Sequence, residues 1–316
     1  MTAVAITRMG DLFAVVMLSG IYSLLSAALF LDLHAVDVAF TEASVGAGIS
    51  TLLFLATLKL VPRYDKKSRY KPTLALGVVI ATGALLIYGT FDMPHFGKAD
   101  APVHEHVAPR YLNESMEEIG VPNVVTSVLA SYRGFDTLGE VVVIFTAGIG
   151  VMSLLRISQQ TKEESKSKTP PDMQQQVILR VVAKMMIPLI LIFALYVQFH
   201  GDYGPGGGFQ AGVIFAAGII LYTMLFGLST AQKIFKRKVL ELFTAIGVFL
   251  YASVGFTCLF MGGNFLDYSV LRHDPVHGQH LGILLIELGV GITVASVMIT
   301  IFFKFTWRTV KHKYNQ

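Results

Sequence analysis

The feature that most constrains this chain is a series of apolar runs, each roughly twenty residues long. They begin near positions 11, 37, 73, 136, 178, 208, 239 and 281. A helix of about twenty apolar residues spans the hydrocarbon core of a bilayer. The chain is 53% hydrophobic and only 15% charged, and its mean hydropathy is +0.61, whereas a soluble domain carries about 25% charged residues. We therefore predict an all-α, polytopic membrane protein with eight transmembrane helices.

The positive charges predict how these helices are oriented, because cytoplasmic loops are enriched in Lys and Arg. If the N-terminus is cytoplasmic, 20 of the 25 Lys and Arg residues lie in cytoplasmic segments. Lys98, Arg110, Arg133 and Arg272 fall outside, and Lys184 lies within a span. We predict that both termini are cytoplasmic.

Several classes of function are disfavoured by what the sequence lacks. The formal net charge of +4 reflects the loop asymmetry, and no basic stripe with interleaved aromatic residues indicates a nucleic-acid partner. The single Cys258 cannot form an internal disulfide or a cysteine cluster, and we expect it to be buried in the seventh span. No HExxH motif and no set of nucleophile, base and oxyanion donors is recognisable. We predict that the chain is not an enzyme and holds neither a cofactor nor a metal.

A polar segment divides the chain into two parts. Residues 158–176 are charged, contain Pro170 and Pro171, and show no apolar periodicity, which is typical of a linker. We predict a first module of four helices at residues 1–157, a cytoplasmic linker at 158–176 and a second module of four helices at 177–316. Because no sequence repeat relates the two modules, we expect two different modules rather than an inverted repeat.

Ionisable residues inside the apolar spans are the main indication of function. A charge at membrane depth costs several kcal/mol, so such a residue is a candidate for an ion or proton path. The candidates are Glu42, Asp136, Glu140, Glu287 and Lys184, together with Asp37 and His34 at the mouth of the second helix.

Each candidate also has a structural interpretation. Asp136 and Glu140 are four residues apart and share a helix face, where two close carboxylates favour reversible proton binding, but Asp136 can instead cap the helix. Asp37 and His34 resemble part of an acidic funnel toward Glu42, although His34 can simply form an interfacial hydrogen bond.

The remaining charged positions leave similar alternatives open. Glu287 lies on the path or forms a structural hydrogen bond between helices. Lys184 extends to the cytoplasmic surface or pairs with a buried acid. We expect Glu241 to form an ion pair with the adjacent basic cluster.

Small residues predict irregular backbone at two places. The glycines in the second helix can loosen it into a local bulge. In the sequence HGDYGPGGGFQAG, Pro205, Gly206, Gly207 and Gly208 are incompatible with regular helix. Irregular backbone at a membrane edge must be covered by protein or lie in water, so we predict a tight, protein-covered turn or a re-entrant bend. A short interfacial helix is predicted within residues 121–132.

The second module, with HGDYGPGGGFQAGVIFAAGIILY and LLIELGVGITVASVM, resembles the B subunit of the Mrp-type multisubunit Na⁺/H⁺ antiporters. The first module, with GIYSLLSAALFLDLHAVDVAFTEASVGAGIS and VLASYRGFDTLGEVVVIFTAGIG, resembles the C-terminal region of the large Mrp A subunit and the small membrane subunits of membrane-bound hydrogenases. The resemblance covers nearly the whole chain. In these families the acids that match Glu42, Asp136 and Glu140 are thought to lie on the ion route.

The resemblance implies an accessory, ion-path subunit of an antiporter in the bacterial cytoplasmic membrane. Such a complex would exchange Na⁺ or another monovalent cation for H⁺, driven by the proton motive force. Its partners would be other Mrp subunits, including large antiporter-like chains, and the lipid bilayer. The alternatives are a membrane-arm subunit of a redox enzyme related to complex I, such as a membrane-bound hydrogenase, and a purely structural spacer.

Overall fold

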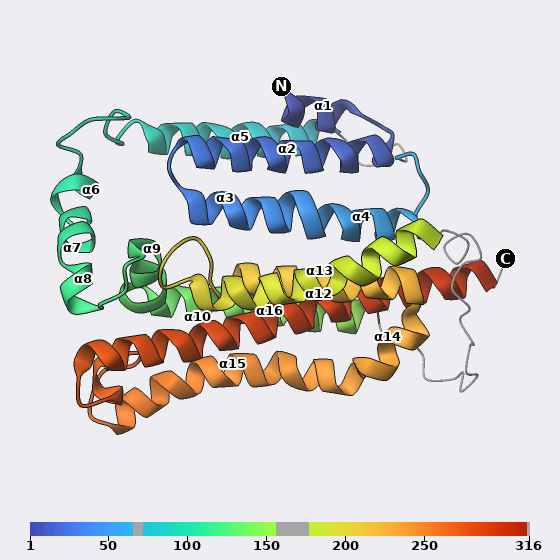
Figure 1. Cartoon of the computed structure of the whole chain (residues 1–316). Helices are drawn as coiled ribbons and strands as arrows, with labels where there is room; N and C mark the ends of the chain where they lie inside the picture. Colours follow the sequence, from blue (N-terminus) through green and yellow to red (C-terminus); the bar gives the residue numbers. More distant parts are fainter. Residues whose placement is uncertain (66–71, 156–176, 315–316) are drawn as a thin grey trace.

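The computed structural model describes residues 1–65, 72–155 and 177–314, and this part of the chain contains helices but no β-strand. Eight of the described helices are long and apolar enough to cross a membrane, which confirms the predicted number of spans. The predicted linker, residues 158–176, lies outside the described residues. The helices run side by side along one axis (Figure 1).

The first half supplies four of the spans. The elements are α1 (Thr2–Arg8), α2 (Leu12–Asp32), α3 (Val36–Glu42), the π-helix η1 (Ala43–Ser50), α4 (Thr51–Leu58), α5 (Pro72–Thr90) and α10 (Gly134–Leu154). The segments α3, η1 and α4 together form the second span.

The second half supplies the other four spans. Its elements are α12 (Val177–His200), α13 (Gly208–Phe226), the short α14 (Leu228–Ile234), α15 (Arg237–Phe260), the 3₁₀-helix η3 (Tyr268–Leu271) and the long α16 (Pro275–Tyr314). Asp274 caps the start of α16, where its Oδ1 accepts a hydrogen bond of 3.0 Å from the N–H of Val276.

The segment between α5 and α10 folds into short helices at one end of the bundle, which we call the loop end (Figure 1). These are α6 (Pro102–Glu105), α7 (Ala108–Asn113), α8 (Ser115–Glu118), α9 (Val124–Thr126) and the π-helix η2 (Ser127–Tyr132). Helix was predicted within residues 121–132 and is confirmed, although it is divided between α9 and η2. The side chain of Arg110 pairs with Glu118 at 2.9 Å, and Tyr132 donates a second hydrogen bond to the same carboxylate.

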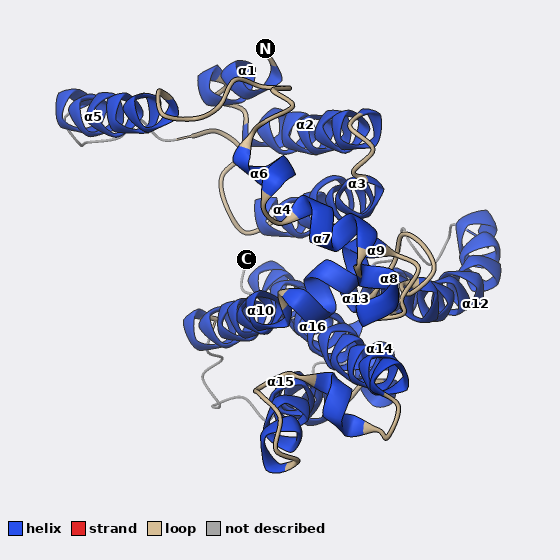
Figure 2. Ribbon diagram, turned by 90° about the vertical axis from the view of Figure 1, so that its left-hand side faces the viewer, coloured by secondary structure: helices blue, strands red, loops and turns tan. Residues whose placement is uncertain are grey.

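The core is organised around α16, which packs against α10, α13 and α15 (Figure 2). Ile283, Ile286 and Val294 of α16 are completely buried. Close approach depends on glycine, because a Cβ atom on Gly289 would lie 2.7 Å from the carbonyl oxygen of Gly247 in α15. The fourth span of the first half therefore packs directly on helices of the second half, and the two halves share one core.

The expected bulge in the second span is present as the π-helix η1. Gly46 lies against α2, where a Cβ atom would be 2.6 Å from Oγ of Ser23. The hydroxyl of Thr51 donates a 3.4 Å hydrogen bond to the carbonyl oxygen of Gly46, five residues earlier. The small residues thus allow both the wider helical turn and the close contact with α2.

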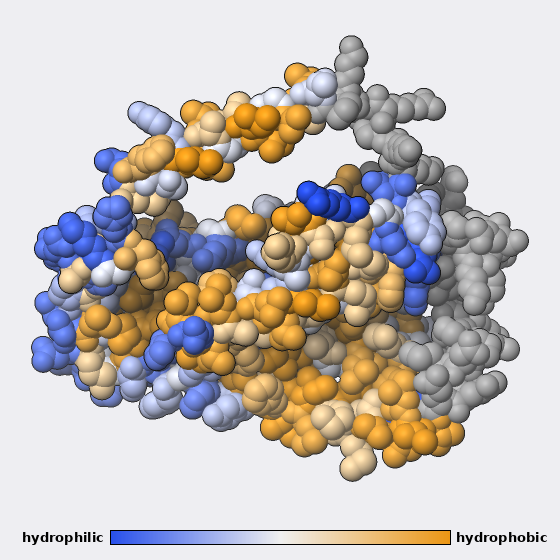
Figure 3. Space-filling view, turned by 90° about the horizontal axis from the view of Figure 1, so that it is seen from above, coloured by the Kyte–Doolittle hydropathy of each residue, from blue (hydrophilic) through white to orange (hydrophobic). Residues whose placement is uncertain are grey.

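Helix α5 stands apart from the other described helices (Figures 2 and 3). None of the residues in its membrane-spanning stretch is buried within the chain. A Cβ atom added to Gly77, Gly83 or Gly89 would meet no atom within 4 Å. The surface of this helix is mostly apolar (Figure 3), so lipid or another protein must cover it in a membrane.

Candidate functional site

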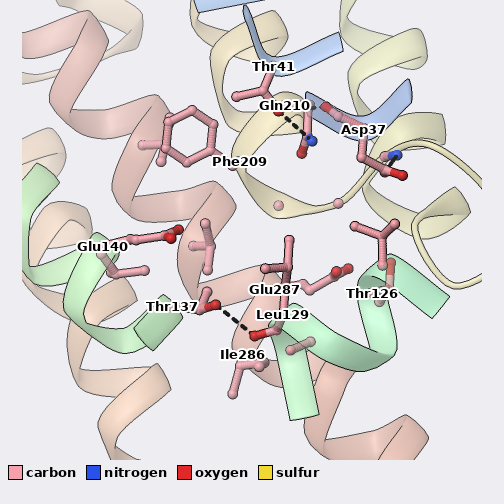
Figure 4. A pocket seen from close by; sticks show the side chains of 18 of the residues that line it. Asp37, Thr41, Thr126, Leu129, Thr137, Glu140, Phe209, Gln210, Ile286 and Glu287 are labelled. Carbon is pink, nitrogen blue, oxygen red and sulfur yellow. Dashed lines mark hydrogen bonds between the residues drawn. The ribbon is translucent and has the colours of Figure 1, made fainter. Parts of the chain in front are cut away.

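A cavity of about 520 Å³ opens where the two halves of the chain meet. Its walls come from α3, α9, η2, α10, the α12–α13 turn, the start of α13 and the middle of α16. Most of the lining is apolar, and the polar groups are confined to a few side chains and to the glycine-rich turn (Figure 4).

Three carboxylates line this cavity, each from a different helix. Asp37 comes from α3, Glu140 from α10 and Glu287 from α16. Glu140 lies on one side, Asp37 lies on the opposite side beside Gln210, and Glu287 projects between them (Figure 4). All three belong to membrane-spanning segments, so the cavity brings acids from both halves together at membrane depth.

The α12–α13 turn forms the part of the wall nearest Asp37. Gly206, Gly207 and Gly208 are buried, and the N–H of Gly206 donates a 3.2 Å hydrogen bond to Oδ1 of Asp37. Gly207 has a φ of +119°, a conformation that favours glycine. Its N–H donates a 3.1 Å hydrogen bond to the carbonyl oxygen of Val197. The sequence predicted a tight turn covered by protein, and the structure has one.

Glycines also bring the turn against Glu287. A Cβ atom on Gly208 would lie 2.0 Å from the backbone oxygen of Glu287, and one on Gly207 would lie 3.1 Å from its Oε1. Gly201 packs against Gly207, and a Cβ atom on Gly201 would lie 3.2 Å from Oε2. Side chains larger than hydrogen at these positions would displace Glu287 or the turn.

Uncharged polar side chains complete the site, and the sequence analysis missed them. The amide of Gln210 donates a 2.8 Å hydrogen bond to the hydroxyl of Thr41, which itself donates a 2.9 Å bond to the backbone oxygen of Asp37. Thr126 and Thr137 also line the cavity. The spacing of Asp37 and Thr41, four residues on one helix, places both on one face and could have indicated Thr41.

Hydroxyl groups satisfy the irregular backbone around η2. Thr137 donates a 2.7 Å hydrogen bond to the carbonyl oxygen of Leu129 (Figure 4). Tyr268 donates a 3.0 Å bond to the carbonyl oxygen of Ala130, and Tyr251 a 2.7 Å bond to that of Gly134. Both tyrosines are completely buried. These bonds fix the start of α10, and therefore the position of Glu140, from the second half of the chain.

The expected funnel from Asp37 and His34 toward Glu42 is not formed. Asp37 and Glu42 are five residues apart and point in different directions on the helix. Oε1 of Glu42 approaches Gly46, beside Ser23 of α2, so the carboxylate faces the α2 contact rather than the cavity. His34 is exposed in the α2–α3 turn with a φ of 61°, and its Nδ1 is 3.0 Å from the carbonyl oxygen of Asp32.

Asp136 and Lys184 also lie outside the cavity lining. Asp136 is exposed in the first turn of α10 and forms an ion pair of 2.6 Å with Arg133. Lys184 is exposed on α12, and its Nζ lies 5.8 Å from the centre of the Phe226 ring. Glu241 forms a 2.6 Å ion pair with Arg237 at the end of the bundle opposite the loop end, as predicted. Cys258 is completely buried, also as predicted.

The arrangement has the chemistry of an ion-binding cavity. Carboxylate, hydroxyl and amide oxygens are the ligands that hard cations prefer. Each carboxylate can also take up a proton and so lose its charge, which makes binding of a proton and binding of a cation mutually exclusive at the same oxygen atoms. A polar site enclosed by apolar walls favours ions that are paired with these groups over unpaired ions.

Family models match both halves of the chain. A model described as a domain related to the MnhB subunit of Na⁺/H⁺ antiporter matches residues 178–300. Models described as the D and E subunits of MBH match residues 1–63 and 73–175.

Similar proteins are found among curated sequences. A relative in Rhizobium meliloti (strain 1021), described as a probable A/B subunit of a K⁺/H⁺ antiporter, is 26% identical over 315 residues, which cover 89% of this chain and 31% of the relative. A putative antiporter subunit mnhB2 of Staphylococcus haemolyticus (strain JCSC1435) is 34% identical over 135 residues, which cover 40% of this chain and 92% of the relative. The chain thus spans about a third of the first relative and nearly all of the second.

Two solved structures resemble the fold. One is from the Mrp complex of Dietzia sp. DQ12-45-1b, with a TM-score of 0.75 and 26% identity over 96% of this chain and 33% of that chain. The other is from the membrane-bound sulfane sulfur reductase, an archaeal respiratory membrane complex, with a TM-score of 0.56 and 29% identity over 74% of this chain and 97% of that chain.

Proposed function

The chain belongs to the family of the MnhB subunit of Na⁺/H⁺ antiporters, and on that premise we propose that it is an ion-path subunit of a multisubunit antiporter that exchanges a monovalent cation for protons. The observation that carries this proposal is the cavity at the boundary between the halves. It gathers Asp37, Glu140 and Glu287, which are far apart in the sequence, at one site within the membrane-spanning region.

The three acids provide a simple basis for exchange. An ionised carboxylate attracts a cation, and a protonated one does not. Glu287 lies between Asp37 and Glu140 (Figure 4), so it can pass a cation or a proton from one to the other through the cavity. An unpaired charge at this depth is costly. Each carboxylate is therefore more stable when it binds either a cation or a proton than when it is ionised and empty.

The chain works as part of a larger assembly in this proposal. The R. meliloti relative is about three times as long as the matched region, so its activity involves further segments. Other Mrp subunits, including large antiporter-like chains, would complete the path in the bacterial cytoplasmic membrane. Helix α5, unburied within this chain, supplies surface for such contacts.

The test uses everted vesicles that contain the whole complex and measures dequenching of a pH-sensitive dye on addition of Na⁺ or K⁺. Glu140→Gln and Glu287→Gln keep the size of each side chain but remove its ability to ionise. We expect both to abolish exchange with normal subunit content on gels. Glu241→Gln, in the ion pair at the opposite end of the bundle, is the matched control and should retain exchange. Full activity of both cavity variants would contradict the proposal.

One alternative has a specific observation in its favour. The likeness to a chain of the sulfane sulfur reductase covers 97% of that chain, and this fits a membrane-arm subunit of a redox-driven pump. Purification of the native complex separates the two functions. A redox pump would carry electron-transfer centres and move ions on reduction, whereas an antiporter would respond to an imposed pH gradient alone. A spacer subunit would tolerate neutralisation of all three acids.

A further inference from the structure

Besides the three carboxylates of the cavity, a pair of titratable groups lies at the loop end, close to the cavity but outside its lining. Nδ1 of His280, in the second turn of α16, is 3.5 Å from Oδ2 of Asp202 in the α12–α13 turn. The side chains are 33% and 22% exposed, so water reaches both of them. Neither residue takes part in the site described above.

The surroundings of His280 determine where its protons lie. Its Nε2 is 3.1 Å from the carbonyl oxygen of Gly120, and because a carbonyl can only accept, Nε2 carries the hydrogen. A neutral ring therefore directs the lone pair of Nδ1 at the Asp202 carboxylate, and the two repel each other. One additional proton, on Nδ1 or on Asp202, turns this contact into an attraction.

The pair is connected to the cavity through a single residue. Gly201 immediately precedes Asp202 and lies beside the Glu287 carboxylate, since a Cβ atom on Gly201 would lie 3.2 Å from Oε2. The carbonyl oxygen of Gly201 accepts hydrogen bonds from Thr126 at 2.7 Å and from the Asn123 side chain at 3.1 Å. The N–H of Asn123 also donates a 3.0 Å bond to the carbonyl oxygen of Asp202. These hydrogen bonds fix the backbone of Gly201 and Asp202 beside the cavity.

We propose that the His280–Asp202 pair is the station at which Glu287 exchanges protons with water at the loop end. This inference rests on the proposed antiport function. A proton from water binds the pair, passes from Asp202 to the Glu287 carboxylate through water at the cavity mouth, and neutralises Glu287, which then releases its cation. In the reverse direction a cation displaces the proton from Glu287, and the proton returns to Asp202 and His280 and leaves to water.

Other ionisable groups surround the station. Asp37 of α3 and Glu287 of α16 line the cavity beside the α12–α13 turn, which carries Asp202. On the first turn of α16, His277 pairs with Asp274 at 2.7 Å and is 68% exposed. His200, at the end of α12, stacks on the ring of Tyr196 at 4.8 Å between ring centres. His277 is therefore a histidine on the same helix and at the same end that has its own carboxylate partner.

The test measures exchange by the whole complex as a function of pH and of cation concentration. We expect Asp202→Asn and His280→Gln to lower the rate by about tenfold or more, since positioned proton donors contribute about 10²-fold to 10⁴-fold. The loss should be greatest at alkaline pH, where protons are scarce, and the half-saturating cation concentration should not change. His277→Gln should match the wild type.

Chemical rescue distinguishes a relay from a structural contact. In His280→Ala, imidazole added to the medium should restore exchange, because it can carry the missing proton, whereas it cannot restore a lost link to Gly120.

Assembled Asp202→Asn and His280→Gln complexes with wild-type rates and pH profiles would overturn the inference, and so would assembled but slow complexes whose loss is equal at every pH. If Glu287→Gln is inactive while these variants are normal, only the relay fails. If Glu287→Gln and Glu140→Gln are both active, the proposed function itself fails.

Discussion

The backbone N–H of Gly206 donates a hydrogen bond of 3.2 Å to Oδ1 of Asp37, a residue 169 positions earlier in the chain. The neighbouring Gln210 reaches the same helix through Thr41 at 2.8 Å. An acid contributed by the first half is thus positioned by a turn of the second half. The cavity exists only when the two halves are docked, which makes its integrity sensitive to the backbone of the turn.

Gly207→Val should therefore reduce assembly before it changes ion selectivity. A β-branched residue at a φ of +119° is strained by about 1–3 kcal/mol, and its Cβ would lie 3.1 Å from Glu287. We expect less of the protein in membranes on gels and normal selectivity in the remainder. Gly10→Val, where a Cβ meets no atom within 4 Å, is the control. A fully assembled complex with altered selectivity would instead place the turn backbone on the ion path.

The hydrogen bond between Gln210 and Thr41 should couple the stabilities of the two halves. Gln210 is only 7% exposed, so Thr41→Val leaves a buried amide without its partner and should cost about 1–3 kcal/mol. Thermal unfolding of the purified complex would be measured for Thr41→Val, Gln210→Leu and the double variant. We expect the double variant to be more stable than the sum of the single effects implies. Strict additivity would mean that the bond contributes nothing.

Glu42 and Glu140 should differ in their effects, although the sequence alone treats them alike. Glu140 lines the cavity, while Oε1 of Glu42 and Oγ of Ser23 would each lie 2.6 Å from a Cβ atom on Gly46, at the contact with α2. We expect Glu140→Gln to abolish exchange and Glu42→Gln to slow it while lowering the melting temperature of the complex. Ser23→Ala should reproduce the effect on melting temperature. Equal loss of exchange in both Gln variants, at unchanged melting temperature, would show that Glu42 also carries ions.

The short helices at the loop end should remain docked over a defined range of pH. The hydrogen bond from Tyr132 and the Arg110 guanidinium hold the pKa of Glu118 below its usual range. The ionised Glu118 therefore stabilises the docked helices fully above about pH 4.3. This stabilisation is lost as the pH falls through the lowered pKa. Burial and the Glu118 carboxylate raise the pKa of Tyr132 to about 12. The protonated Tyr132 hydroxyl therefore stabilises the docked helices fully below about pH 10, and this stabilisation is lost as the pH rises toward 12.

Hydrogen exchange of residues 108–118, followed by mass spectrometry, checks this range. In Tyr132→Phe, the pH below which residues 108–118 lose protection from exchange should rise toward the ordinary carboxyl pKa. The loss of protection at alkaline pH should disappear. Tyr111→Phe keeps the ring contact with Tyr132, at 4.9 Å between ring centres, and should leave both limits in place. Identical exchange in Tyr132→Phe and the wild type at every pH would refute the role of this hydroxyl.

The sequence predicted what depends on local pattern. Apolar runs indicated the spans, because a helix must satisfy its backbone polar groups within itself in lipid. The glycines indicated a bulge in the second span and an irregular turn before α13, because glycine adopts backbone conformations that other residues avoid. The common face of Asp37 and Thr41 also follows from their spacing, although Thr41 was not predicted as part of the site.

What the sequence could not predict is the packing between distant segments. Nothing local indicates that α10 packs on α16 rather than on its own module, so the meeting of Glu140 with Glu287 was not predictable. Asp202 and His280 lie on different elements, and their contact follows from the docking of the turn on α16. The direction of Glu42 depends on how the second span packs on α2, because a Cβ atom on Gly46 would lie 2.6 Å from both Oε1 of Glu42 and Oγ of Ser23.

The length of α16 has a mechanical consequence. At about 1.5 Å per residue, its 40 residues form a rod of about 60 Å, roughly twice the thickness of the hydrocarbon core. The rod carries Glu287 in its first half and ends at Tyr314, on the far side of the bundle. A continuous helix transmits rotation and axial shift along its whole length, so a spectroscopic label beyond Arg308 would report, from outside the bilayer, each movement of the cavity wall.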